Sequence, residues 1–409
     1  MKPKILWNNK DFPLLPSGYA IMGRYILPIL GDHYGRDNVI IYAPVYQREY
    51  MDRWEDMLVV PGVTFDYGEN YLLEHYQHHK CNILVQIGDV WGLGTLPDMA
   101  ARNDVLWVQW CAVDWIGMPK NVVYRIRTAH KLVPFAKDGE AKLRKAGLNN
   151  VEKAIWLGLD TELWKPGEPG ESMMRLMGFT PETFNILMVS ANQERKAIRQ
   201  QIEGIATFRK ANPEAQVRFY IHTTMKRDRD LFADIDELGL ADITHYPEEY
   251  LMSMGGVSEV EMVKMFNACD VVLNACHEGF GYATLQAQAV GKPVVYLYEG
   301  PSPELVKYGV GVADMFTYTT SNQMCQAFPH PAGIAQALGT VWKWKKEGKK
   351  LFSQKAVDFV QANFGWNKIA EQWIGVIDRA MEDRVHFCHD IPSSSDELQN
   401  RSLEEVVKE

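Results

Sequence analysis

Apolar, β-rich runs alternate with helix-length amphipathic stretches along most of the chain, and this alternation occurs twice. In the first half, the runs expected as buried strands are residues 5–7, 39–42, 83–87, 105–108 and 131–135. In the second half they are residues 185–189, 217–221, 271–273 and 293–297. Near-continuous apolar runs separated by helices are typical of parallel strands that are covered on both faces. The sequence therefore predicts an α/β chain with two doubly wound sheets.

The chain length and one turn-rich segment divide this alternation into two units. The 409 residues correspond to roughly two to three domains at about 150 residues each. Residues 163–170 are rich in proline and glycine, as interdomain linkers are. We therefore expect one Rossmann-like domain over residues 1–165 and a second over residues 166–365. Twin domains of this kind face each other across a cleft, and ligands bind at the carboxyl ends of their strands.

The charge balance and the cysteines exclude several classes of protein. Lys and Arg number 43 and Asp and Glu 52, so the net charge of −9 provides no global positive field for nucleic acid or anionic lipid. The six cysteines form no CxxC pair, which excludes the common zinc spacings and indicates reduced thiols. The N-terminal apolar stretch ends at Trp7, too early for a signal peptide, and no apolar run reaches about 18 residues. We expect a cytoplasmic, soluble protein without stable membrane insertion, and a flexible tail over residues 386–409.

Residues 276–295 are the most informative segment. They are predicted to form a strand end, a carboxylate, a glycine turn, a helix, a glycine and a strand, with Glu278 just before Gly279 and Gly281. Glycines let backbone N–H groups approach a ligand, and a helix that starts near Tyr282 directs the positive end of its dipole at an anion. The pattern predicts a diphosphate site in which Glu278 hydrogen-bonds hydroxyl groups. The alternative is an ordinary βα turn with an exposed glutamate.

A second segment, residues 190–196, follows the first predicted strand of the second domain and ends in Arg195 and Lys196. Arginine binds a diphosphate bidentately, and lysine acts as a point charge. Cations at the start of a helix oppose its dipole, so another benefit must keep them there. We favour a diphosphate clamp over the alternative of a solvated basic loop.

Four stretches, in the right order, resemble the family-4 retaining glycosyltransferases of GT-B fold, which use a nucleotide-sugar donor. They are residues 17–24, which resemble the family's glycine-rich loop, residues 154–166, which resemble its linker signature, residues 192–196, and the Glu278 motif with its tail at residues 291–295. The resemblance covers about residues 4–380. It implies two Rossmann-like domains facing across a cleft, and a helix over residues 366–385 that crosses back to the first domain.

The resemblance also implies the donor site. Its donor-binding residues are, in this chain, Gly18, Asn192, Arg195, Lys196, Glu278, Gly279, Phe280, Gly281, Tyr282 and Gln286. Gln286 stands where the family usually has a second glutamate, which holds the ribose hydroxyls of the donor. A glutamine still donates to and accepts from a diol, but it loses the charge-assisted part of the hydrogen bond. We expect a UDP-sugar in preference to a GDP-sugar, no cofactor, and no metal, because the two cations would supply the positive charge.

Asp114 is the polar residue of the first domain that matches a subset of the family. It stands near the point where many members carry a histidine close to the donor sugar. We interpret it as a catalytic residue that either accepts a hydrogen bond from the donor sugar or orients the acceptor hydroxyl. A helix N-cap is the alternative. The predicted catalytic set is then Glu278, Asp114, Arg195 and Lys196.

Three further residues of the first domain are predicted on the acceptor side. Asp89 lies at a predicted strand end, where it contacts an acceptor or caps the next segment. Tyr19 and Trp115 belong to an unusually dense set of aromatic residues. Aromatic rings stack on sugars and on nucleobases alike, so they do not decide the acceptor.

Two other patterns are interpreted without a ligand. Residues 74–79 hold one glutamate and three histidines at a helical spacing that suits a metal, but a solvated helix face is the favoured interpretation. Residues 342–350 are basic with interleaved aromatics, as in surfaces that touch nucleic acid or membranes. We interpret them as a helix C-terminus with Gly348 at C′ and the tryptophans packed inward.

The resemblance implies a retaining, metal-independent glycosyltransferase, a hexosyl- or pentosyltransferase, that moves a sugar from a nucleoside diphosphate sugar to an acceptor hydroxyl. A saccharide acceptor is the family default. The alternatives are a phage-type DNA glycosyltransferase acting on a hydroxymethylated base, a sugar-nucleotide epimerase and a non-catalytic sugar-nucleotide binder. The net negative charge opposes the DNA acceptor.

Overall fold

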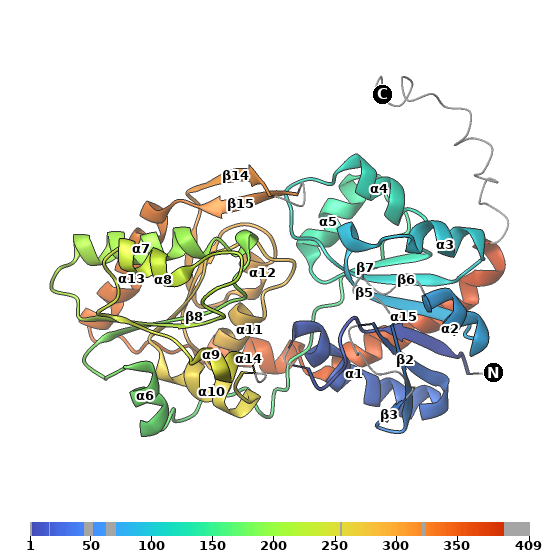
Figure 1. Ribbon diagram of the computed structural model, residues 1–409, viewed down its shortest axis with the longest axis horizontal. Helices are drawn as coiled ribbons and strands as arrows, with labels where there is room; N and C mark the ends of the chain where they lie inside the picture. The colour runs from blue at the N-terminus through green and yellow to red at the C-terminus, as the bar shows by residue number, and fades with distance from the viewer. Residues whose placement is uncertain are drawn as a thin grey trace, which may run out of the picture.

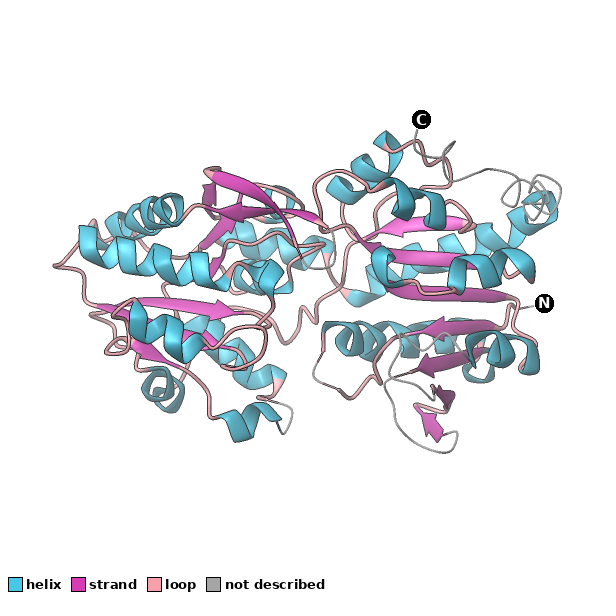
Figure 2. Cartoon of the chain, turned by 45° about the horizontal axis from the view of Figure 1, so that its top comes forward, coloured by secondary structure: helices cyan, strands magenta, loops and turns pink. Residues whose placement is uncertain are grey.

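The structure is a computed structural model that describes residues 2–15, 17–44, 52–62, 71–253, 256–320 and 324–387. Two sheets lie in separate halves of the molecule, each between layers of helices (Figures 1 and 2). This arrangement confirms the predicted α/β class with two Rossmann-like domains. The expected tail lies outside the described residues from residue 388 onward.

The sheet of the first domain has the strand order β3-β4-β2-β1-β5-β6-β7. Its strands are β1 (Ile5–Asn8), β2 (Val39–Ala43), β3 (Asp52–Trp54), β4 (Met57–Pro61), β5 (Ile83–Asp89), β6 (Trp107–Ala112) and β7 (Lys131–Pro134). All neighbouring strands are parallel except the edge pair β3 and β4. The strand order reverses between β1 and β5, the point at which open α/β sheets bind ligands.

Alternate residues of each central strand enter different cores, because successive side chains of a strand point to opposite faces. Ile5 and Trp7 of β1 belong to one core and Leu6 to the other. The helices of this domain are α1 (Gly18–Tyr34), α2 (Leu72–His78), α3 (Leu96–Arg102), α4 (Lys120–Ile126) and α5 (Lys137–Lys145). Both faces of the sheet are therefore buried, as the continuous apolar runs predicted.

The sheet of the second domain is parallel throughout, with the order β10-β9-β8-β11-β12-β13. Its strands are β8 (Phe184–Val189), β9 (Val217–His222), β10 (Thr244–His245), β11 (Val271–Asn274), β12 (Val294–Leu297) and β13 (Gly309–Val312). Its helices are α6 (Glu171–Met177), α7 (Ile198–Ala211), α8 (Leu231–Glu237), α9 (Glu249–Ser253), α10 (Glu259–Ala268), α11 (Tyr282–Ala289), α12 (Ser302–Leu305), α13 (Pro331–Lys346) and α14 (Gln354–Asn363).

A β-hairpin that the sequence did not predict follows β13. It consists of β14 (Met315–Thr319) and β15 (Cys325–Pro329), which pair antiparallel outside the main sheet. The backbone N–H of Ile116 in the first domain donates to the carbonyl of Cys325, 2.8 Å away. The hairpin thus joins the second domain to the first at one side of the cleft, and its strand ends reach toward the first domain in Figure 1.

The last described helix, α15 (Trp366–Phe387), lies against the first domain rather than the second (Figure 1). The ring of Trp373 is fully buried, with its centroid 5.5 Å from that of Trp7 and 4.9 Å from that of Trp110. The hydroxyl of Tyr34 on α1 donates to the carboxylate of Asp378 at 2.9 Å. Two indoles of the first domain and one of α15 therefore share a single core.

The segment over residues 342–350 behaves as a helix end. Trp342 packs against Phe184, and Trp344 stacks on Tyr308 with the ring centroids 5.7 Å apart. Gly348 follows the helix with a φ of +70°, which an L side chain adopts only with strain. The interpretation as a C-terminus with inward tryptophans is confirmed. In the described part of the chain, no helix is both long and apolar enough to cross a membrane.

Candidate functional site

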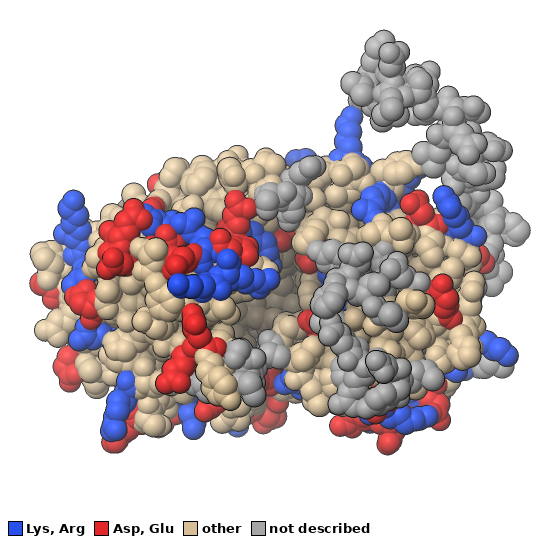
Figure 3. Space-filling view, in the orientation of Figure 1, with Lys and Arg blue, Asp and Glu red and all other residues tan. Residues whose placement is uncertain are grey.

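The candidate site lies where the carboxyl ends of strands from the two domains meet. β5 ends at Asp89 and β6 leads to Asp114, whereas β8 leads to Arg195 and β11 to Glu278. The space-filling view shows a hollow between the two halves of the molecule on this face (Figure 3). In Rossmann-like domains, ligands usually bind at the carboxyl ends of the parallel strands. The predicted residues from opposite domains are therefore brought to one place.

Glu278 is held by both predicted cations. Lys196 forms a close ion pair with its Oε1 atom, and Nη1 of Arg195 lies 3.6 Å from its Oε2 atom. The same Nη1 atom lies 3.6 Å from Oδ2 of Asp114 in the other domain. Arg195 therefore bridges two carboxylates across the cleft. The alternative of a solvated basic loop for this pair is wrong, because Lys196 is buried.

The pKa values of Asp114 and Glu278 are shifted in opposite directions. Burial raises the pKa of Asp114 to about 6, although Arg195 acts in the opposite direction. Burial also acts to raise the pKa of Glu278, but Lys196 and Arg195 outweigh it and hold this pKa below its ordinary value. No described group hydrogen-bonds the buried Oδ1 atom of Asp114. The site therefore holds one firmly ionised carboxylate and one that titrates near neutrality.

The glycine turn fits closely between the domains. A Cβ atom at Gly279 would lie 2.7 Å from the Cβ atom of Ala112 at the end of β6, so only glycine lets the turn approach this strand. Gly281 has a φ of +102° and directly precedes α11. A Cβ atom at Gly18, the first residue of α1, would lie 3.9 Å from the ring of Tyr282, the first residue of α11. The N-termini of two helices from different domains thus meet here, and both favour an anion.

A second polar cluster lies on the first-domain side. The hydroxyl of Tyr19 donates to Asp89 at 3.1 Å, and Nζ of Lys10 lies 3.5 Å from the same carboxylate oxygen. Nζ of Lys10 also lies over the ring of Tyr19, 4.8 Å from its centroid. Burial and the neighbouring Asp89 raise the pKa of Tyr19 well above its usual value, so its hydroxyl stays protonated. This cluster can offer donors and acceptors to a hydroxyl-bearing ligand.

Comparison with protein families finds a match for the second domain. Residues 183–339 match the family model described as Glycosyl transferases group 1. The MMP alpha-(1->4)-mannosyltransferase of Mycolicibacterium hassiacum is 24% identical over 233 residues, which are 57% of this chain and 49% of that protein. A D-inositol 3-phosphate glycosyltransferase of Paenarthrobacter aurescens is 30% identical over 142 residues, 34% of this chain and 33% of that protein. The chain spans about half the length, or less, of the curated relatives that it matches.

Comparison with solved structures covers both domains. Sucrose-phosphate synthase from Thermosynechococcus elongatus superposes with a TM-score of 0.71 at 14% identity, over 92% of this chain and 98% of that one. HepE of Anabaena, solved in complex with UDP-glucose, superposes with a TM-score of 0.68 at 15% identity, over 92% and 100%. The second domain is therefore similar to the group 1 glycosyltransferases, and the chain has the GT-B fold of these solved glycosyltransferases.

Several residues of this GT-B protein lie elsewhere than the sequence suggested. Trp115 was predicted on the acceptor side, but its side chain is fully buried in the core of the first domain and its indole N–H donates to Met118. Phe280 is also a core residue, so only its backbone can contact a donor. Asn192 is buried, and its amide donates to the carbonyls of residues 224, 225 and 229. It positions the neighbouring loop instead of facing the cleft.

The capping alternatives are wrong for both first-domain carboxylates. The next helix after Asp114 is α4, which begins at Lys120 with Pro119 at its N-cap. Asp89 precedes a short 3₁₀ turn but makes no capping hydrogen bond to it. Both side chains are directed to the polar clusters of the cleft. The structure leaves Gln286 half-buried on α11, one of the residues whose role stays a prediction.

The sequence interpretation missed Lys10, which completes the cluster with Tyr19 and Asp89. Its signal was the polar run of residues 8–10 directly after the first strand, at the edge where ligands bind. Gly88 has a φ of +136°, and a Cβ atom there would lie 2.2 Å from Cε of Lys10. Asn9 was also missed. It donates to the carbonyls of Asp11 and Tyr19 and so holds the loop before α1.

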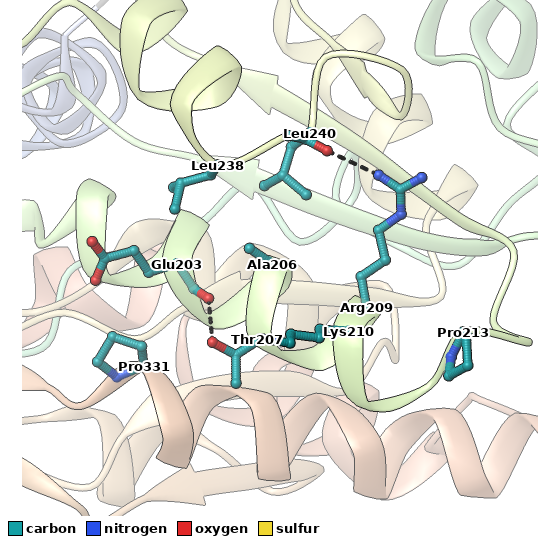
Figure 4. A pocket seen from close by; sticks show the side chains of 10 residues that line it. Glu203, Ala206, Thr207, Arg209, Lys210, Pro213, Leu238, Leu240 and Pro331 are labelled. Carbon is teal, nitrogen blue, oxygen red and sulfur yellow. Dashed lines mark hydrogen bonds between the residues drawn. The ribbon is translucent and has the colours of Figure 1, made fainter.

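A surface pocket of about 670 Å³ lies apart from these residues (Figure 4). It is lined by side chains from α7, the end of α8 and the start of α13, among them Thr207, Arg209 and Leu238. No strand end contributes to its lining, so we do not assign it to the site. Within the described ranges, no group of three or more His, Cys, Asp or Glu side chains is arranged to hold a metal, and this includes the histidines of α2.

Proposed function

We propose that the protein transfers a sugar from a nucleoside diphosphate sugar, preferably a UDP-sugar, to a hydroxyl of a saccharide, with retention at the anomeric carbon. The observation that carries the proposal is the bridge of Arg195 between Glu278 and Asp114, with Lys196 on the same glutamate. Fixed cations and helix N-termini at the edge of both sheets suit a diphosphate leaving group.

In this proposal, Arg195 and Lys196 bind the diphosphate. The bond between the anomeric carbon and the diphosphate oxygen breaks, and the negative charge that develops on this oxygen is stabilised by the two cations and the N–H groups of the glycine turn. These groups are already in place before the reaction, so little reorganisation is needed. A divalent ion is then not required, and we propose metal-independent turnover.

The acceptor oxygen attacks on the face that the leaving group departs from, which retains the anomeric configuration. The new bond joins the acceptor oxygen to the anomeric carbon, and the proton of the acceptor hydroxyl passes to the leaving phosphate oxygen. Glu278 orients the hydroxyls of the donor sugar. Asp114 and the cluster of Lys10, Tyr19 and Asp89 are positioned to bind the acceptor from the first domain.

The activities of the similar proteins support this choice of chemistry. They include a mannosyltransferase, inositol phosphate glycosyltransferases and a sucrose-phosphate synthase, and one structural neighbour was solved with UDP-glucose. We also propose a cytoplasmic location, because the five cysteines of the described chain are free thiols and four of them are buried.

The test is a screen for release of nucleoside diphosphate from UDP- and GDP-sugars, with mass spectrometry of the products. Candidate acceptors are mono- and oligosaccharides, sugar phosphates and hydroxymethylated DNA, and each reaction is run with and without excess EDTA. We expect a UDP-sugar and a saccharide to react in both conditions, and NMR of the product to show a retained anomeric centre. Transfer only to DNA, or activity that EDTA abolishes and magnesium restores, would overturn the corresponding part of the proposal.

A further inference from the structure

A groove of about 610 Å³ lies between the β14–β15 hairpin and the first turn of α7. Three aromatic side chains of the hairpin form one wall, and charged residues of α7 and the adjoining loops form the other. The lining residues that matter here are Phe316, Tyr318, Phe328, Glu194, Arg199 and Asp228. None of these residues has a role in the reaction proposed above.

The hairpin fixes this groove beside the candidate site. The side-chain amide of Gln326 donates to the carbonyl of Asp114 at 2.8 Å, and the backbone N–H of Ala327 donates to Nδ1 of His277 at 3.1 Å. On the opposite wall, Glu194 directly precedes Arg195. Both walls are therefore attached to residues next to the bridge between Arg195 and Glu278, and a ligand that extends out of the cleft would meet the groove.

Two of the three aromatic side chains, Phe316 and Tyr318, are exposed, and they lie over Phe328, which is buried. Phe316 and Phe328 are paired in register, and their rings stack with centroids 5.8 Å apart. Tyr318, two residues along β14, lies on the same face and is 50% exposed. Clustered exposed aromatic residues on a soluble protein usually mark a binding surface. Aromatic faces pack well against the C–H faces of sugar rings, while the tyrosine hydroxyl can hydrogen-bond.

The charged wall is balanced. Glu194 and Asp228 line the groove together with Arg199 and Arg229. Arg199 is paired with Asp234 and Glu237 at 2.9 Å, and the carboxylate of Asp228 accepts from the backbone N–H of Glu194 at 3.2 Å. Figure 3 shows acidic and basic side chains interleaved over α7 and α8. Such a surface suits a neutral ligand with many hydroxyls, whereas a nucleic acid backbone requires an excess of cations.

We propose that this groove binds the sugar units of an oligosaccharide acceptor that lie away from the reacting hydroxyl. The inference rests on the proposed function, because it names the kind of acceptor that the site takes: a chain longer than the unit that reacts. The aromatic wall supplies stacking, and the paired carboxylates and guanidinium groups supply fixed hydrogen-bond partners.

The test compares Tyr318→Ala, Phe316→Ala and the double variant with the wild type. Leu176→Ala is the matched control, because Leu176 is an exposed apolar side chain on α6, far from the hairpin in Figure 1. Binding of mono- to hexasaccharides of glucose and of mannose is measured by NMR titration without donor, and KM and kcat are measured for the same series. A thermal melt checks that each variant is folded, and Tyr318→Phe keeps the ring if Phe316→Ala unfolds the hairpin.

We expect the wild type to bind longer chains more tightly than the monosaccharide. For the longer chains, the alanine variants should bind about tenfold more weakly and show a KM about tenfold higher, with the monosaccharide kinetics and UDP affinity unchanged. The inference is overturned if the variants keep the length preference, or if no saccharide of the series binds. It is also overturned if the substitutions weaken oligonucleotide binding or self-association of the protein instead of saccharide binding. Failure of the proposed function gives a different result: the wild type would then release no nucleoside diphosphate, whatever the NMR titration shows.

Discussion

Arg195 is the residue on which the candidate site depends most. Its guanidinium group lies 3.6 Å from carboxylates of both domains, and these carboxylates raise its pKa although burial acts to lower it. A permanently charged group between two carboxylates can exchange one of them for a phosphate without changing its own protonation state. This is the property that a diphosphate clamp needs.

Replacing Arg195 and Lys196 together with alanine should weaken UDP binding by about 2–4 kcal/mol, because charge-assisted hydrogen bonds to the diphosphate are lost. Isothermal titration calorimetry of the folded double variant measures this. The control is Arg209→Ala, which removes an exposed cation paired with Asp242 on the outer face. Wild-type UDP affinity in the double variant would falsify the clamp.

Glu278 and Gln286 should respond differently to substitution. Glu278→Gln should lower kcat by about 10²-fold or more, because the charged group sits where the transition state develops. Gln286→Ala should raise the donor KM with a smaller change in kcat, since a ribose contact stabilises ground and transition states alike. Steady-state kinetics with varied donor separate the two. Gln286→Glu should remain active, and an inactive Gln286→Ala at saturating donor would reverse the two roles.

Asp114 should make stability depend on pH. Its pKa is raised by burial to about 6, so the folded protein binds a proton that the unfolded chain releases between the ordinary pKa of Asp and about 6. Protonation relieves the buried charge, so stability gains from this residue as pH falls through about 6. The stability of the wild type relative to Asp114→Asn should rise by up to about 3 kcal/mol from neutral pH to about pH 4.

Denaturant unfolding curves of the wild type and Asp114→Asn, recorded across this pH range, measure the effect. Taking the difference between the two proteins removes the contribution of Glu278, whose depressed pKa acts in the opposite sense. A difference that stays constant with pH would contradict the assignment.

At the scale of the element, the glycine turn before α11 packs closely against the end of β6. The φ of Gly279 is not positive, so alanine can adopt its backbone conformation, and a substitution there is limited by contacts with the backbone and Cβ atom at the end of β6. Helix α11 depends on this turn for its position, because Gly281 stands at its N-cap without a side-chain cap.

Gly279→Ala should therefore lower kcat/KM by about tenfold or more, because a misplacement of the turn by less than an ångström moves Glu278 and the N-terminus of α11 away from the donor. The matched control is Gly339→Ala in α13, where a new Cβ atom meets only a ring carbon of Phe208 at 4.0 Å. That variant should gain about 0.5–1 kcal/mol of stability at unchanged activity. Equal activity of the two variants would contradict the close fit.

At the scale of the whole molecule, α15 makes the second half of the chain necessary for the first domain. It carries Trp373 into a cluster with Trp7 and Trp110, more than 260 residues away in the chain. Its Arg379 makes only an exposed ion pair with Glu152. The buried indole therefore contributes much more to the stability of this contact than the exposed ion pair does.

Trp373→Ala should destabilise the protein by about 3–5 kcal/mol, because it removes a large buried side chain and leaves a cavity. Arg379→Ala should change stability by less than about 1 kcal/mol. Thermal and denaturant unfolding compare the two variants. A small effect of Trp373→Ala would mean that α15 docks on the first domain without sharing its core.

The sequence by itself determined the elements whose signal is local. Buried parallel strands such as β1, β5 and β11 are continuous apolar runs, and the helices that cover them have a regular period, so a short window contains the information. The Arg195–Lys196 pair and the Glu278 turn were found in the same way, because each is a contiguous motif at a strand end. The short edge strands β3, β10 and β13 were missed, since partial exposure and glycine weaken their pattern, and the inner strand β4 was missed as well.

Only the tertiary structure decided which side chains meet. Asp114 and Arg195 are 81 residues apart and belong to different domains, and the β14–β15 hairpin reaches the first domain through contacts that no local pattern records. Trp115 was placed in the cleft by its residue type and Phe280 by the family motif that it matches, whereas the direction of each side chain puts both in a core. Residue type and periodicity specify an element and its buried face, but which distant groups face each other depends on how whole sheets pack.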